Sequence, residues 1–237
     1  MSEGQGSRGA RARIAGSFQA SVGDIIFGME DGAVSIFGLV FGVAAGSSDS
    51  HAVVLAGTTG AVAAAVSMMA GAYLEAQSMR DRARAEIEAK REELERDPEA
   101  VRARIAARLD SLGFTDAEAS TVVTALLREP STMLAYEEAV ELRLGDTAHQ
   151  DPRAHAAWMF ASDVIAASIP VIPFIFLPID EARVVSLVIT TALLILLGIG
   201  RGIVAQRSMV VTTFQTLAIA AAAAIAGVAI GHLVGRM

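Results

Sequence analysis

Two acidic side chains interrupt an otherwise apolar segment between Ile25 and Gly46. They are Glu30 and Asp31, and Asp31 lies about a third of the way into the segment. If that segment spans a membrane, an ionised carboxylate inside it costs roughly 2.5–3.5 kcal/mol on insertion scales. Such a cost predicts a functional role for Asp31, whereas Glu30 can also be explained by a position nearer the membrane surface.

A potential metal ligand of a different kind occurs in the next apolar segment. Met68 lies within the sequence Ser67-Met68-Met69. A thioether sulfur binds soft or borderline metals and is inexpensive to bury. Because most methionines in membrane helices only pack against neighbours, Met68 becomes a candidate ligand only together with other evidence.

A group of glutamates follows these two segments. One predicted helix carries Glu86, Glu88, Glu92, Glu93 and Glu95, and a later one carries Glu138 and Glu141. Spacings of three, four and seven residues place members of each set on a shared helix face. Carboxylates on facing helices bind hard divalent cations such as Fe²⁺ or Mn²⁺. A solvated face of Glu–Arg pairs is the commoner reason for such a pattern and stays open as the alternative.

Several classes of protein are disfavoured by what the sequence lacks. It has no cysteine, which excludes disulfides and thiolate metal sites. It has no histidine between Gln77 and Ala148, so an enzyme such as a ferroxidase is not expected. It also has no Gly-rich phosphate loop, so transport driven directly by ATP hydrolysis is not expected. A net charge of −7 argues against nucleic acid as a partner. We expect no permanently bound cofactor.

The elements that must position these residues are membrane helices. The sequence is 53% hydrophobic, and five apolar segments are long enough to cross about 30 Å of hydrocarbon. The predicted spans are 25–46, 52–74, 156–179, 184–200 and 209–234. We therefore predict an all-α integral membrane protein, a five-helix bundle with the lipid bilayer as its surroundings.

A charged insert separates the second and third spans. The insert, residues 77–150, is predicted to be a cytoplasmic helical metal-binding domain. The other predicted parts are a flexible arm (1–20), spans one and two (21–76) and spans three to five (151–237). The insert holds 16 acidic and 11 basic residues. Helix N-caps are predicted at Asp97, Thr115 and Ser131, and a helix end at Gly113. The first insert helix is expected to continue from span two.

The arginines beside the spans predict the orientation. They are concentrated in the N-terminal arm, at both ends of the insert and between spans four and five, where Arg201 and Arg207 lie. Because basic residues are retained on the cytoplasmic side, the N-terminus and the insert are expected in the cytoplasm and the C-terminus outside. Glycines at four-residue spacing in the first and fifth spans predict close helix packing or a dimer contact.

Long sequence motifs resemble the vacuolar iron transporter family. The stretch from Asp24 to Gly46, with Glu30-Asp31-Gly32 at its centre, and the sequence from Ser67 to Leu74 are similar to the family's first two helices. The resemblance covers nearly the whole chain and includes the glutamate-rich insert ahead of Pro98. It implies proton-coupled export of ferrous iron, often also manganese, by a homodimer whose spans line a central path.

The resemblance also assigns roles to individual residues. Asp31 and Met68 match the transport aspartate and methionine, with Glu30 beside them in the path. The metal ligands that it implies in the insert are Glu86, Glu93, Glu99, Glu138 and Glu141. The sequence departs from the family at four positions: Lys90 and Ala72 stand where glutamate is common, Glu30 stands where asparagine is common, and Asp163 adds an acid to span three.

We therefore predict a proton-coupled antiporter in a bacterial inner membrane that exports Fe²⁺ or Mn²⁺. The insert is expected to gather these ions and to accept other divalent cations. The alternative is a membrane protein that does not transport, whose acidic insert senses metal or docks a partner. Asp31 discriminates between the two, because a sensor needs no carboxylate inside a span.

Overall fold

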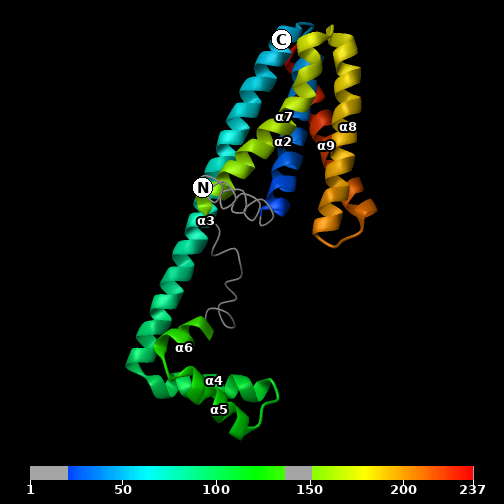
Figure 1. Cartoon of the computed structure of the whole chain (residues 1–237). Coiled ribbons are helices and arrows are strands. Elements are labelled where there is room, and N and C mark those ends of the chain that lie inside the picture. The colour runs from blue at the N-terminus through cyan, green and yellow to red at the C-terminus, as the bar shows by residue number, and fades with distance from the viewer. Residues whose placement is uncertain (1–20, 137–150, 237) are drawn as a thin grey trace, which may run out of the picture. The chain divides into compact units, whose positions relative to one another are not determined.

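The computed structural model describes residues 21–136 and 151–236. These residues form helices and connecting turns without a strand, as the all-α prediction required. They divide into two compact units (Figure 1). The first contains the described residues up to Leu74 and from Asp151 onward, and the second contains those between.

Five helices of the described chain are long and apolar enough to span a membrane. They are α2 (Val22–Gly46), α3 (Ser50–Arg96), α7 (Pro152–Phe176), α8 (Ile179–Val204) and α9 (Met209–Val234). The number of spans is thus confirmed. As predicted, α3 runs without a break from the second span into the insert, because no proline or glycine signal stops it before Asp97.

Helix α8 is longer than the predicted fourth span of 184–200. It begins at Ile179 with Asp180 and Glu181 in its first turn, and it ends at Val204 with Arg201 in its last turn. Acidic residues near a helix N-terminus and basic residues near its C-terminus are stabilised by the helix dipole. The charges that seemed to delimit the span are therefore part of the helix, and the assignment of Arg201 to a connecting loop was wrong.

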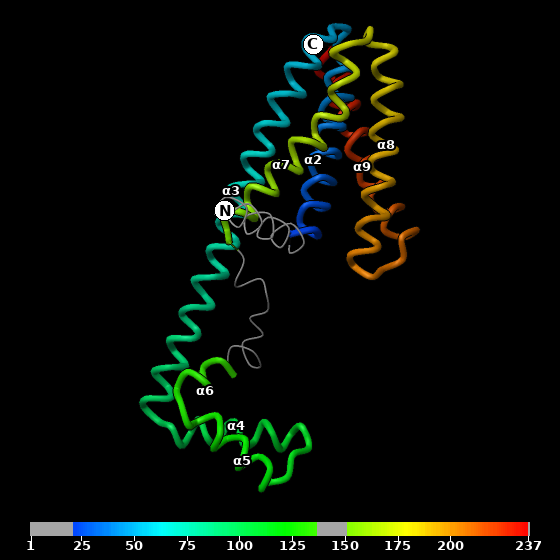
Figure 2. Tube along the Cα trace, viewed as in Figure 1, coloured from blue at the N-terminus to red at the C-terminus, as the bar shows by residue number. Residues whose placement is uncertain are grey.

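Helix α2 forms the centre of the membrane-spanning unit. It packs against α7, α8 and α9, and about half of its most apolar stretch is buried. The tube in Figure 2 shows the α2–α3 turn, the α7–α8 turn and the end of α9 together at the top. The start of α2 and the α8–α9 turn lie toward the other end of this unit. Glu30 and Asp31 belong to the half of α2 nearer the α8–α9 turn.

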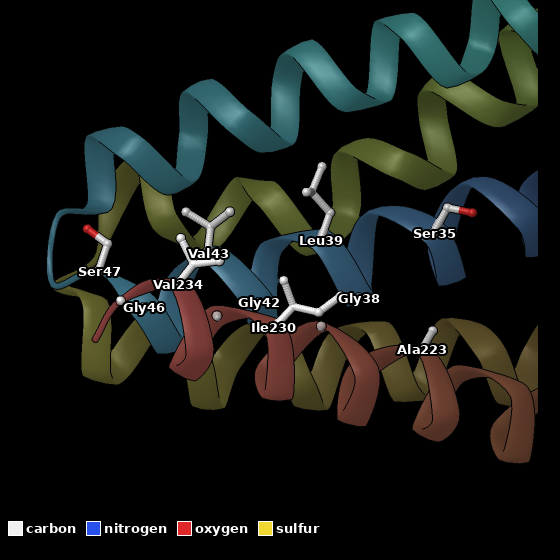
Figure 3. Close-up of a pocket in the computed structure, with 13 residues that line it drawn as sticks. Ser35, Gly38, Leu39, Gly42, Val43, Gly46, Ser47, Ala223, Ile230 and Val234 are labelled. Atoms are coloured by element: carbon white, nitrogen blue, oxygen red, sulfur yellow. The ribbon is translucent and has the colours of Figure 1, made fainter. Parts of the chain in front are cut away.

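Glycines bring α2 and α9 into backbone contact. A Cβ atom added to Gly42 would lie 2.8 Å from the carbonyl oxygen of Gly227, and one added to Gly46 would lie 2.6 Å from that of Gly231. Figure 3 shows this contact and the apolar groove beside it, in which Leu39, Val43 and other residues of the two helices form the lining. The glycine spacing therefore does pack helices closely, in this case within one chain.

The second unit is a small helical domain. Besides the C-terminal part of α3, it contains α4 (Pro98–Ser111), α5 (Asp116–Leu126) and α6 (Pro130–Tyr136). Its core is apolar and is formed by Val101, Ile105, Leu109, Ala119, Val123 and Met133. Burial of these side chains contributes to the stability of the insert's described helices.

The predicted helix ends in this unit are mostly confirmed. Asp97 caps α4 by accepting a hydrogen bond from the Ala100 backbone N–H at 3.0 Å. Glu118 accepts hydrogen bonds from the Thr115 N–H (2.9 Å) and hydroxyl (2.7 Å) at the start of α5. The cap predicted at Ser131 is wrong, because α6 already begins at Pro130, a residue that suits the first helical position.

Candidate functional site

Asp31 lies on an exposed face of α2. Phe27, Asp31, Ser35 and Leu39, spaced four residues apart, are all exposed. Residues at this spacing form one continuous stripe along a helix. We call these four residues the exposed stripe of α2. A carboxylate in the middle of such a stripe cannot face lipid alone without a large energetic cost.

Met68 lies at a similar depth in the neighbouring helix. About 22 Å of helix separates Asp31 from the end of α2 at Gly46, and about 27 Å separates Met68 from the start of α3 at Ser50. The two helices pack at Gly57 and Gly60, whose added Cβ atoms would approach side chains of Val40 and Ile36. Met68 is half-buried, so its sulfur is not enclosed in the core.

Glu30 has a quite different environment from Asp31. Its side chain is buried, and Arg201 of α8 donates to both carboxylate oxygens, at 3.0 and 3.2 Å. The Thr216 hydroxyl of α9 donates to Oε1 at 2.5 Å. The two neighbouring acids therefore lie on different faces of α2, one buried and one exposed. Neither Arg201 nor Thr216 was identified from the sequence, because their partner is more than 170 residues away.

Asp163 is the most deeply buried acid among the described residues. It is fully buried in α7, and within the described part of the chain neither carboxylate oxygen has a hydrogen-bond partner. Its Oδ1 contacts the position that a Cβ on Gly32 would occupy. Only glycine at that position leaves room for the carboxyl group, which places Asp163 directly beside the residue that follows Asp31.

The insert glutamates have mixed surroundings. Glu93 pairs with Lys90 and Arg104, each at 3.3 Å, and Glu99 lies 3.7 Å from Arg102. Glu86 is exposed, and Glu138 and Glu141 lie outside the described residues. Within residues 21–136 and 151–236, no three acidic or histidine side chains come together as a metal site. The metal site predicted for the insert thus stays a prediction.

Lys90 and Ala72, which stand where the family commonly has glutamate, have clear positions. Lys90 forms its ion pair with Glu93, one helical turn away on α3, so it neutralises one of the predicted ligands. Ala72 is buried, with 7% of its surface exposed. A small apolar side chain fits that position without the burial cost that a glutamate would carry.

Comparison with known proteins identifies the family. None of the curated proteins compared with the chain matches it. The sequence model described as the VIT family matches residues 22–232, which include the first four spans, the insert and nearly all of the fifth span. The match covers far more than half of the 237 residues. By its sequence and its five apolar helices, this chain belongs to the VIT family of membrane proteins that transport metal ions.

Proposed function

We propose that this protein is a proton-coupled antiporter that exports ferrous iron or manganese from the cytoplasm, with Asp31 and Met68 as ligands of the transported ion. The position of Asp31 carries the proposal. It is an acidic residue in the interior of a span, on an exposed stripe, and at nearly the depth of a thioether in the next helix. Carboxylate oxygen and thioether sulfur together suit a borderline divalent metal.

A homodimer explains why Asp31 is exposed. The polar stripe residues, Asp31 and Ser35, cannot remain against hydrocarbon without cost. Ser35 and Leu39 also line the apolar groove between α2 and α9, so the stripe and the groove form one continuous surface. A second copy of the chain covering this surface would place two Asp31 carboxylates around a shared path, and small residues would allow its helices to approach closely.

Coupling follows from competition at one carboxylate. A metal ion binds the deprotonated form of Asp31, and a proton that occupies the carboxylate displaces the metal. When the outside is the more acidic compartment, metal is released there and the proton is released in the cytoplasm. Met68 contributes to ion selection but not to coupling, because a thioether does not titrate in this range.

The insert would supply ions to the path. Its acidic helices are proposed to gather Fe²⁺, Mn²⁺ or other divalent cations on the cytoplasmic side of a bacterial inner membrane. The rival function is a sensor or docking protein without transport. It would not explain why a carboxylate is placed inside a membrane span, where it costs free energy. Members of this family are transport proteins and in general not enzymes.

The test is metal-driven proton movement in liposomes at matched protein content. Asp31→Asn keeps the size of the side chain but removes its charge, so it should insert normally and lose coupled flux. Met68→Ala should change the preference among Fe²⁺, Mn²⁺, Co²⁺ and Zn²⁺ more than the coupling. Coupled flux at the wild-type level in Asp31→Asn would refute the mechanism. Glu30 and Asp163, the two buried acids of the bundle, would then be tested in the same assay.

A further inference from the structure

The hydrogen bonds of Glu30 connect three helices at one level of the bundle. Its carboxylate belongs to α2, Arg201 to α8 and Thr216 to α9. The second guanidinium nitrogen of Arg201 donates to the Thr212 carbonyl at 3.2 Å and to the Gln215 side-chain oxygen at 3.3 Å. Arg201 therefore contacts α2 and α9 at the same time.

The same level contains a second link between α8 and α9. The buried Thr212 hydroxyl lies 2.7 Å from the Gly198 carbonyl oxygen and donates to it. Gly198 and Gly202 allow this approach, because an added Cβ on either would lie within 2.8 Å of α9 atoms. The Glu30 carboxylate is thus bound by two helices that are themselves fixed to each other.

This environment does not suit a group of the ion path. Both oxygens of Glu30 already accept hydrogen bonds from Arg201, and the guanidinium compensates the charge. A metal ion would have to displace this cation from a site that is only 7% exposed. Removing one member of a buried ion pair leaves the other charge uncompensated, which is strongly unfavourable.

The consequence for Asp31 comes from helix geometry. Successive residues of an α-helix are about 100° apart around its axis, so the direction of Glu30 fixes the direction of Asp31. The glycines of α2 also restrict this rotation, because a Cβ atom at Gly42 or Gly46 would lie within 2.8 Å of the α9 backbone. The Glu30 hydrogen bonds add attractive contacts with defined donors and acceptors, which tolerate little rotation.

We infer that Glu30 is a positioning residue, and that its ion pair with Arg201 and its hydrogen bond from Thr216 hold α2 in the rotation that presents Asp31 on the exposed stripe. The inference rests on the proposed function in one respect, namely that Asp31 binds the transported ion. It assigns Glu30 a role different from that of the path residue expected from the sequence.

The test uses a second substitution to recover a function that the first one impairs. Arg201→Gln leaves the Glu30 carboxylate without its cation inside the bundle, so we expect the KM for Mn²⁺ flux in liposomes to rise on the order of tenfold. Adding Glu30→Gln removes that charge and leaves two amides able to hydrogen-bond each other. The double variant should then return to within about twofold of the wild-type KM.

Other roles for Glu30 predict other results. If Glu30 were a ligand, adding Glu30→Gln to Arg201→Gln would remove it and could not restore the KM, and this outcome would overturn the inference. Wild-type KM in the Arg201→Gln variant would overturn it as well. If Arg201→Gln does not fold, Arg201→Lys takes its place. Lysine keeps the charge but cannot contact Glu30 and α9 through two separate nitrogens, so the KM should rise by less than tenfold. A wild-type KM in Arg201→Lys together with Thr216→Val would overturn the inference.

Asp31→Asn, assayed in parallel, separates this inference from the proposed function. If Asp31→Asn transports Mn²⁺ as wild type does, the proposed function fails. The pairing of Glu30 with Arg201 is then still measured by thermal unfolding of the two single variants and the double variant. If the loss of stability in the double variant differs from the sum of the losses in the two single variants, Glu30 and Arg201 are coupled in the structure. If the losses add, the ion pair does not form.

Discussion

The contact between α2 and α9 predicts a large effect for a very small substitution, Gly42→Ala. The added methyl carbon would lie 2.8 Å from the Gly227 carbonyl oxygen, whereas ordinary contacts of Cβ atoms begin at 3.4 Å. The two helices would have to separate by about 0.6 Å. A helix carbonyl cannot rotate away as a side chain can, so the strain has to be distributed along the whole contact.

The magnitude follows from two opposing terms. Overpacking a close contact costs about 1–3 kcal/mol, and a rigid backbone neighbour places this case near the upper end. Alanine has a higher helix propensity than glycine by about 1 kcal/mol, which offsets part of the cost. We expect Gly42→Ala to lower the free energy of unfolding by about 2 kcal/mol.

A matched control is available in the next helix. Gly71 lies in α3 with nothing within 4 Å of an added Cβ, so Gly71→Ala should be neutral or stabilising by up to about 1 kcal/mol. Both variants are compared by SDS-induced unfolding in mixed micelles, followed by the fluorescence of the single tryptophan, Trp158. If Gly42→Ala were as stable as wild type, the backbone contact between α2 and α9 would not exist as described.

Three further predictions concern the insert and the orientation. Replacing four of the five predicted insert ligands by alanine should reduce Mn²⁺ binding in calorimetry and slow flux at low metal; unchanged stoichiometry would reassign them to a solvated surface. The four replaced residues are Glu86, Glu93, Glu138 and Glu141. A reporter fused after Met237 should be extracytoplasmic and one inserted near Gly113 cytoplasmic, and finding both on one side would exclude the five-span orientation. The hydrogen bonds from Thr115 lower the pKa of Glu118. The stability that they give α5 should therefore be present above the ordinary glutamate pKa and be lost as pH falls through the lowered value. The readout is a smaller protection factor of the α5 amides against hydrogen exchange, and equal protection factors in Glu118→Gln and wild type at neutral pH would contradict this.

Local features of the sequence were sufficient for much of the fold. Apolar runs of about 20 residues determine membrane helices regardless of their partners, because an unpaired backbone cannot remain in hydrocarbon. The caps at Asp97 and Thr115 were predictable for a related reason, since each satisfies backbone groups within a few residues. Asp31 could be identified from the free-energy cost of a carboxylate inside a membrane span, without any knowledge of its neighbours.

The tertiary structure decided which neighbour each polar group meets. Glu30 and Asp31 are adjacent in the sequence and nearly equal in chemistry, yet one is bound by Arg201 inside the bundle and the other is exposed. Asp163 likewise meets Gly32 only because α7 packs on that side of α2. Periodicity places a residue on a face of its own helix, but the rotation of that helix against the others depends on contacts between residues far apart in the chain, which no local pattern records.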